Sequence, residues 1–329
     1  MRHDDPRHND PSPGHRLLVT GANTPLGERI VRQLLRTPGV EDVIGVGFEA
    51  EGPVISDEPR FVYRAVDLTS GRQAHELLFG LARDHQTQIV LHTAMHRGLS
   101  AQGGRVHAQN VEALRELLTL AERHPTLRRL VLRSYGEVYQ IRNDLPTLIT
   151  EDHPLNMSPK APQWVRDRVE ADLTACTRMG LCDELEIAVL RLGEILAPGT
   201  GSQLFDYLEA PICLRPAGYD PMMNLLSLDD AARALILGAL AWGVQGVFNI
   251  PGADTLPLTE VIHRWGRVGL PVSSALLTPI YRLRRRLRGA EFSYGMNRRR
   301  FHYGAVLDGG RALTKLGYTP SQRVLWPTA

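Results

Sequence analysis

The sequence predicts an α/β fold built on a doubly wound parallel sheet, with a smaller mixed α/β lobe towards the C-terminus. Three observations predict it. Short apolar runs alternate with amphipathic segments of helical length from residue 16 onward. A glycine-rich turn separates the first apolar run from the first amphipathic segment. The chain has 329 residues, 43% hydrophobic and 22% charged, enough for one large α/β domain with an attached lobe.

The elements follow in order along the chain. Residues 1–15 are polar, rich in Pro, His and Asp, and are predicted to form a disordered leader. RLLVT, at 16–20, is a short buried strand, and TPLGERIVRQLL is an amphipathic helix. Five further strands are predicted at DVIGV, FVYRAV, QIVLHT, RLVLRS and IAVLRL, with helices near residues 70–84, 105–123 and 160–179.

The C-terminal part has denser loops and a mixed pattern. After APGTGS, at 197–202, a helix is predicted in LSLDDAARALILGAL, with Ser227 as its N-cap and Asp229 and Asp230 in the first turn, where carboxylates favour the helix dipole. GVFNI is one more strand. We therefore expect a dinucleotide-binding domain over 16–200 and a lobe over 201–329 that is interleaved with it.

Composition argues against several classes of protein. The sequence has no run of about 18 apolar residues and no charged start followed by an apolar block, so we expect no spanning helix, no secretory signal and a cytoplasmic location. Cys176, Cys182 and Cys213 form no CxxC pair and are expected to be reduced. A net charge of only +2 and the lack of a recognised module predict no nucleic-acid partner.

The stretch VTGANTPLG, at 19–27, is a candidate phosphate-binding loop. Gly21 and Gly27 take the first and last places of a GxxGxxG spacing, whereas Thr24 takes the middle one. Pro25 removes one amide donor but suits the first turn of a helix. A plain strand-to-helix turn is the alternative. About twenty residues on, where an acid normally holds the ribose, stand Gly47, Phe48 and Glu49, which do not decide between NAD and NADP.

Motifs between Arg16 and Pro320 resemble the extended short-chain dehydrogenase/reductases, the NAD-dependent epimerase/dehydratase group. They are VTGANTPLG, AVDLT (65–69), VLHTAMH (90–96), NVEALRELL (110–118), LRLGEILAPGT (190–200), LSLDDAARAL and KLGYTP. The resemblance implies a Rossmann-type sheet, NAD or NADP as cofactor and a small-molecule ligand. By position, the cofactor-binding residues would be Gly21, Asn23, Thr24, Leu26, Gly27, Asp67, Leu68, Thr93, Ala94 and Arg191.

The catalytic motif of that family is degenerate here. The family uses a Tyr that exchanges a proton, a Lys four residues later, and a Ser or Thr that orients the substrate oxygen. In APQWVRDRVEADL (161–173), Trp164 and Arg168 stand at the Tyr and Lys positions, and Tyr135 stands at the Ser/Thr position. An indole N–H only donates, and a guanidinium does not give up its proton at neutral pH.

The sequence therefore predicts an NAD(P)-binding protein that is catalytically silent or altered and acts by ligand binding or oligomerisation. Two alternatives stay open. One is an active NAD(P)-dependent oxidoreductase or epimerase/dehydratase on a sugar-nucleotide, steroid-like or lipid substrate, with Tyr135 or Glu137 handling the proton. The other is a cofactor-free scaffold. Ser134 is not expected to replace the missing hydroxyl, because successive strand residues point to opposite faces.

Three further expectations concern metals and partners. His92 and His96 share a strand end, where their side chains diverge, so we assign them structural roles and predict no metal. The resemblance implies a homodimer through helices 105–123 and 160–179. The segment 273–300, which contains YRLRRRLR, predicts a lid helix over the substrate cleft with a solvated arginine face, or a peripheral contact with an anionic membrane or acidic ligand.

Overall fold

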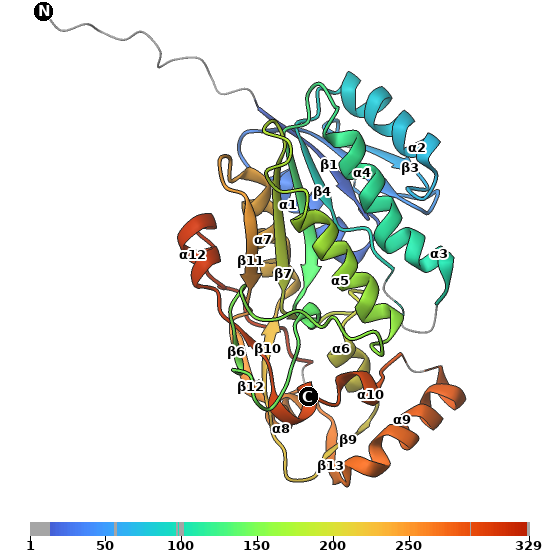
Figure 1. The fold of residues 1–329 in the computed structure, drawn as a ribbon, viewed down its shortest axis with the longest axis vertical. Helices are drawn as coiled ribbons and strands as arrows, with labels where there is room; N and C mark the ends of the chain where they lie inside the picture. The colour runs from blue at the N-terminus through green and yellow to red at the C-terminus, as the bar shows by residue number, and fades with distance from the viewer. Residues whose placement is uncertain (1–13, 56–57, 97, 99–101, 290, 328–329) are drawn as a thin grey trace, which may run out of the picture.

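A computed structural model describes residues 14–55, 58–96, 98, 102–289 and 291–327 (Figure 1). Most of the predicted leader lies outside the described residues. His15, which the sequence analysis placed in the leader, instead begins the first strand, because its amide donates to the carbonyl of Gly39 at 2.6 Å and it pairs with Val40. Among the described residues, no helix is both long and apolar enough to cross a bilayer.

The predicted doubly wound parallel sheet is confirmed. Its seven strands lie in the order β11-β7-β5-β4-β1-β2-β3, and every neighbouring pair is parallel. The strands are β1 (His15–Thr20), β2 (Val40–Gly47), β3 (Phe61–Ala65), β4 (Ile89–His92), β5 (Arg129–Tyr135), β7 (Glu186–Leu192) and β11 (Gly246–Ile250). The strand order reverses between β1 and β4, so a ligand crevice is expected at the carboxyl ends of these two strands.

Helices cover both faces of the sheet, and each face has its own apolar core. One core joins the sheet to α1 (Pro25–Leu34), α7 (Leu228–Leu240) and α12 (Gly310–Leu316). The other joins it to the helices on the opposite face. These are α2 (Gly71–Glu76), extended by a π-helical turn over Leu77–Ala82, then α3 (Gly104–His107), which continues through a π-helical turn over Ala108–Glu112 into α4 (Ala113–Ala121), and α5 (Gln163–Cys176).

Helix starts follow the capping residues in the sequence. The hydroxyl of Thr24 accepts the amide of Gly27 at 3.0 Å, and Pro25 occupies the first helical position of α1. The hydroxyl of Ser227 accepts the amide of Asp230 at 3.1 Å at the start of α7, as predicted. The first cap anchors the loop between β1 and α1, which forms part of the site described below.

The C-terminal lobe is built from small sheets and short helices. The strands are β8 (Glu194–Ile195), β10 (Met222–Leu226) and β12 (Asp254–Pro257) in one sheet, β9 (Ile212–Pro216) and β13 (Val268–Val272) in a second, and β6 (Leu148–Ile149) and β14 (Val306–Leu307) in a third. The helices are α6 (Gln203–Leu208), α8 (Leu258–Arg264), α9 (Ser274–Arg288), α10 (Tyr294–Asn297) and α11 (Arg300–Tyr303). An aromatic cluster that includes Tyr207, Phe292 and Phe301 fills the centre of the lobe.

Candidate functional site

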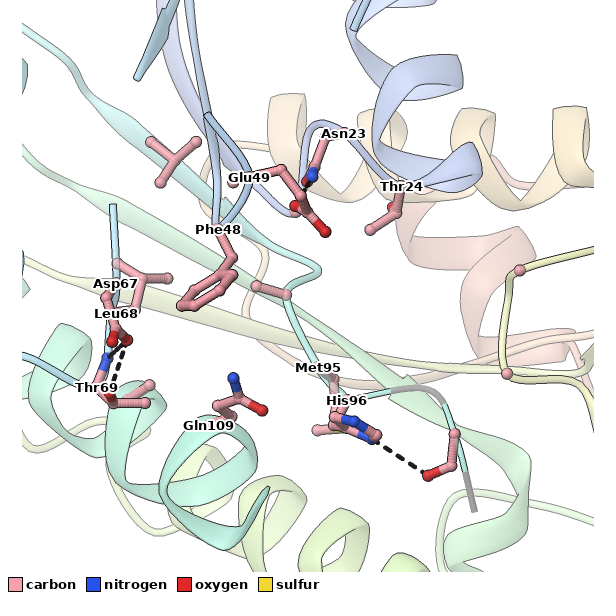
Figure 2. Close-up of a pocket in the computed structure, with 18 of the residues that line it drawn as sticks. Asn23, Thr24, Phe48, Glu49, Asp67, Leu68, Thr69, Met95, His96 and Gln109 are labelled. Carbon is pink, nitrogen blue, oxygen red and sulfur yellow. Dashed lines mark hydrogen bonds between the residues drawn. The ribbon is translucent and has the colours of Figure 1, made fainter. Parts of the chain in front are cut away.

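A cavity of about 590 Å³ opens at the carboxyl edge of the sheet, where the strand order reverses (Figure 2). Its walls come from the loop after β1, the ends of β2, β3 and β4, and the lobe. The lining residues include Gly21, Asn23, Thr24, Gly47, Phe48, Glu49, Asp67, Leu68, Ala94, Met95, His96, Ser202, Phe205, Asp206 and Glu291. The predicted cofactor residues Gly21, Asn23, Thr24, Asp67, Leu68 and Ala94 are thus brought together in one cavity.

The loop between β1 and α1 needs both of its glycines. Gly21 has φ +71°, a conformation that side chains disfavour. A Cβ on Gly27 would lie 2.0 Å from the carbonyl oxygen of Gly21, so only glycine permits this close packing of helix and loop. The N-terminus of α1 consequently faces the cavity behind a tight turn, an arrangement that suits a phosphate group.

Glu49 is a site residue whose position the sequence analysis left open. Its carboxylate accepts a hydrogen bond from the side-chain amide of Asn23, and its carbonyl accepts one from the hydroxyl of Tyr63 at 2.7 Å. Figure 2 shows Glu49 and Asn23 meeting at the upper wall of the cavity. A Cβ on Gly47 would lie 2.4 Å from both the Asn23 Oδ1 and the Tyr63 hydroxyl, so the glycine that ends β2 makes room for this arrangement.

The opposite wall carries the Asp67-Leu68 pair. The Asp67 carboxylate accepts hydrogen bonds from the amide and the hydroxyl of Thr69, at 3.0 and 2.6 Å. Phe48 lies beside this pair in Figure 2, and all three residues line the cavity. Phe48 and Leu68 give this part of the cavity an apolar lining of the kind that accepts a planar base.

Four of the predicted cofactor residues do not line the cavity. Gly27 packs against the Gly21 carbonyl behind the loop. Leu26 is buried in the core beneath α1. Thr93 is buried and donates its hydroxyl to the Thr20 carbonyl at 2.6 Å, which holds β4 against β1. Arg191 forms a buried ion pair: its guanidinium donates to Asp172 at 2.6 and 3.0 Å and to the Tyr139 hydroxyl at 2.9 Å. A direct contact of Arg191 with a cofactor stays a prediction.

The lobe closes the cavity with acidic and small polar residues. Ser202, Asp206 and Glu291 lie on this wall. Burial raises the pKa of Asp206 to about 7, and the nearby carboxylates of Glu194 and Glu291 reinforce the rise. Asp206 is therefore half ionised near neutral pH, and the charge of this wall depends on pH in the physiological range.

The degenerate catalytic positions form one buried stack. The guanidinium carbon of Arg168 lies 3.2 Å from the ring centre of Trp164 and 3.5 Å from that of Tyr135. Arg133 lies over the same tyrosine ring at 4.1 Å and donates to its hydroxyl at 2.6 Å. Arg168, Tyr135 and Trp164 are only 2%, 4% and 7% exposed. The structure therefore brings all three predicted positions together, but as an interlocked cation and two rings.

The stack leaves the Arg168 charge with one carboxylate partner nearby. Its Nη1 lies 3.5 Å from an oxygen of Glu137, and neither Nη atom has a hydrogen-bond partner among the described residues. Burial lowers the pKa of Arg168 to about 10, so the guanidinium remains protonated at neutral pH. Two aromatic faces stabilise a desolvated cation and replace part of the missing hydrogen bonding.

A second, smaller cavity of about 90 Å³ lies next to the stack, with Trp164 in its wall. Glu137, Trp164, Glu194 and Arg300 are among its lining residues, and it shares no lining residue with the larger cavity. Burial and the Glu194 carboxylate raise the pKa of Glu137. Glu194 is held firmly: one oxygen accepts the Ser202 hydroxyl at 2.6 Å, and the other pairs with Arg300.

Ser134 points away from the stack, as the strand alternation predicted. Its hydroxyl donates to the Asp172 carboxylate, beside the Asp172–Arg191 ion pair. The two histidines at the end of β4 have separate partners: Nδ1 of His92 is 2.9 Å from the Thr20 hydroxyl, and Nδ1 of His96 is 3.2 Å from the Gly98 carbonyl. Within the described residues, no group of three or more His, Cys, Asp or Glu side chains is arranged to hold a metal ion.

Sequence comparison finds distant relatives. No protein-family model matches the chain. Three uncharacterized mycobacterial proteins, one from Mycobacterium bovis and two from strains of Mycobacterium tuberculosis, are each 29% identical over 309 residues, which is 92% of this chain and 80% of each relative. The likeness spans both the sheet domain and the lobe.

Solved structures with the same architecture cover nearly the whole chain. A dTDP-glucose 4,6-dehydratase from Bacillus anthracis, solved with NAD, has a TM-score of 0.68 at 18% identity and covers 94% of this chain and 92% of its own. The dehydratase DesIV from Streptomyces venezuelae, also with NAD, has a TM-score of 0.68 at 22% identity over 94% and 92%. A UDP-glucose 4-epimerase from Thermotoga maritima, with UDP-glucose, scores 0.67 at 16% identity over 93% of each chain.

The sheet order and the glycine loop at its switch point define a Rossmann-type α/β protein. More narrowly, the chain shares the fold of these NAD-bound dehydratases and of the UDP-glucose 4-epimerase. At these identities the likeness is one of fold, and a shared fold does not carry a shared reaction.

Proposed function

We propose that this protein binds NAD in the larger cavity and does not carry out the Tyr-Lys proton chemistry of the enzymes whose fold it shares. One observation carries the proposal. Arg168 is stacked between Trp164 and Tyr135, where that chemistry needs an ionisable phenol beside an ammonium group. Neither the indole nor the guanidinium can exchange a proton with a ligand at neutral pH.

The residues of the larger cavity fit a dinucleotide. Gly21 and Gly27 would let the pyrophosphate approach the N-terminus of α1, and Asp67 and Leu68 would meet the adenine edge beside Phe48. The cavity volume of about 590 Å³ lies within the usual range of ligand sites. The nicotinamide of a bound dinucleotide would supply hydride chemistry, but this chain's own residues offer it no ordinary proton route.

Glu49 supports NAD over NADP. A carboxylate beyond the end of β2 accepts hydrogen bonds from the ribose hydroxyls and repels a 2′-phosphate. Asn23 orients the Glu49 carboxylate, which lines the cavity. We therefore infer a preference for the unphosphorylated cofactor.

A silent dinucleotide site would act through binding or assembly, and the homodimer belongs to this proposal. The pairs Arg115–Glu170 at 3.4 Å and Arg178–Glu122 at 2.6 Å tie α4 and its C-terminal end to α5 and the turn after it. A second copy would meet these helices as one rigid surface. Light scattering with and without NAD tests whether assembly depends on the nucleotide. The cytoplasmic location stays a prediction.

A second candidate function is supported by Glu137. This residue lines the smaller cavity and has a raised pKa, so it could donate a proton to a ligand there. Tyr135, the other candidate proton carrier, lines neither cavity and has its hydroxyl occupied by Arg133. If the protein is an oxidoreductase or epimerase/dehydratase, we therefore expect Glu137 to carry the proton.

Calorimetric titration with NAD⁺, NADH, NADP⁺ and NADPH tests the proposal. We expect binding of NAD⁺ or NADH and weaker binding of NADP⁺ and NADPH. In Glu49→Gln, the difference in affinity between the unphosphorylated and phosphorylated cofactors should be smaller. Heat with none of the four would favour the cofactor-free scaffold. If the protein converts UDP-glucose or dTDP-glucose, and this activity is lost in Glu137→Gln but kept in Tyr135→Phe, the site is not catalytically silent. That result would support the second candidate function.

A further inference from the structure

Helix α9 (Ser274–Arg288) has an exposed face whose composition nucleotide binding does not explain. It packs on β9 through the buried residues Leu277 and Tyr281, and the Tyr281 hydroxyl accepts the Leu214 amide at 3.0 Å. No residue of α9 lines either cavity of the candidate site, so α9 itself does not form the lid that was one of the two alternatives from the sequence. The helix lies at the outer edge of the lobe in Figure 1.

The outward side of α9 carries a stripe of leucines. Leu276, Leu283 and Leu287 are 55%, 56% and 75% exposed. Their spacings of seven and four residues place them on one face of the helix, and Ile280 falls on the same face. A soluble helix normally turns such a stripe towards a core, whereas this helix already has a different buried side.

Apolar side chains of the neighbouring sheet extend this surface. Ile212 on β9 and Val268 and Leu270 on β13 are 42%, 57% and 44% exposed. Ile212 pairs with Val268 in the parallel register, and Leu270 follows two residues later, so all three share one face of the sheet. Grouped apolar exposure of this kind marks an interaction surface.

Arginines border the stripe. Residues 273–300 contain eight arginines and one acidic residue, Glu291, although the whole chain has a net charge of only +2. Arg282 and Arg286 are exposed and lie four residues apart, which makes a basic row along one side of the leucines. On the other side of the leucines, Arg284 donates a hydrogen bond to the Ile212 carbonyl at 3.0 Å, so its guanidinium lies next to β9.

We propose that α9 docks this protein on an anionic phospholipid surface, with the leucine stripe in the headgroup layer and the arginines on the lipid phosphates. A helix with an apolar face and bordering cations is the form that binds such an interface. Pairing α9 with α9 of a second copy would bring two basic rows together, which like-charge repulsion opposes. A nucleic acid would neutralise the arginines but leave the leucines in water.

Vesicle co-sedimentation of the full chain tests this proposal. We expect binding to phosphatidylglycerol/phosphatidylcholine vesicles that weakens as salt is raised, and no binding to phosphatidylcholine alone. The double variant Leu283→Gln/Leu287→Gln should weaken binding at least about tenfold, because leucine burial is lost. Leu313→Gln, an equally exposed leucine on α12, is the matched control and should bind as the wild type does.

Two further variants keep the test decisive. Arg282→Gln/Arg286→Gln should weaken binding roughly thirtyfold, at about 1 kcal/mol for each cation near an anionic surface. Leu287→Trp should shift its indole emission to the blue on anionic vesicles. Docking by α9 is excluded if anionic vesicles do not bind, if the leucine pair behaves like Leu313→Gln, or if Leu287→Trp emission is unchanged. If the leucine double variant loses a dimer in light scattering but binds vesicles as the wild type does, the leucine stripe contacts a second copy of the chain and not lipid.

Discussion

Replacing Arg168 by methionine tests whether the buried stack is held by its charge or only by its shape. Methionine keeps contact with both rings but removes two cation–π interactions, at about 2 kcal/mol each when desolvated. It also removes the cost of burying the cation. A fall in the Arg168 pKa from 12.5 to about 10 corresponds to about 3 kcal/mol. The two effects nearly cancel, and we expect Arg168→Met to cost only about 1 kcal/mol where Glu137 is protonated.

The cost should grow as pH rises. Without Arg168, the already raised pKa of Glu137 rises further. A group with a raised folded-state pKa contributes stability below its unfolded pKa and loses it as pH increases through the folded pKa. One titrating carboxyl changes the free energy of unfolding by at most about 1.4 kcal/mol per pH unit, and wild-type Glu137 already shows part of this dependence. Relative to wild type, Arg168→Met should therefore lose up to about 4 kcal/mol more stability near pH 8 than near pH 5. Arg168→Met/Glu137→Gln should lose this extra dependence.

Urea unfolding followed by circular dichroism at the two pH values measures these differences. Arg129→Met is the matched control, because Arg129 is also fully buried but its partner Glu186 is 28% exposed and can remain hydrated. The control should be destabilised about equally at both pH values. A cost of Arg168→Met that does not change with pH, or that Glu137→Gln fails to relieve, would refute the charge-based account of the stack.

Three other changes have defined outcomes. Gly27→Ala should abolish NAD binding in calorimetry, because its Cβ would lie 2.0 Å from the Gly21 carbonyl oxygen, and retained affinity would contradict the phosphate-loop assignment. The dissociation constant for NAD should rise as pH increases through about 7, where Asp206 ionises, and Asp206→Asn should flatten that profile. Burial lowers the pKa of His92 from 6.5 to about 4, so its contribution of about 3 kcal/mol is present above pH 6.5 and lost as pH falls towards 4, and His92→Gln should be correspondingly less acid-sensitive in melting experiments.

The sheet was predictable because buried parallel strands appear as continuous apolar runs. The loop after β1 was predictable for a related reason, since its glycines are required locally by the backbone. Glu49 was not, because its direction depends on Asn23 and on Tyr63 of a different strand. These contacts join segments that no local pattern connects.

The ion pair of Arg191 was not predictable for the same kind of reason. Its partner Asp172 lies on α5, and a buried ion pair between a helix and a strand has no local sequence signature. The acidic wall of the cavity, with Asp206 and Glu291, comes from lobe segments far apart in the chain. The substitutions at Trp164 and Arg168 could be read from the sequence, whereas their stacking on Tyr135 could not.

Glu194 separates two spaces while serving both. One of its oxygens holds Ser202, a wall residue of the larger cavity, and the other holds Arg300, a wall residue of the smaller one. A ligand that displaces Ser202 in the larger cavity would remove one of the hydrogen bonds that fix the carboxylate to which Arg300 of the smaller cavity is bound. The two cavities share no lining residue, yet both depend on the position of the Glu194 carboxylate.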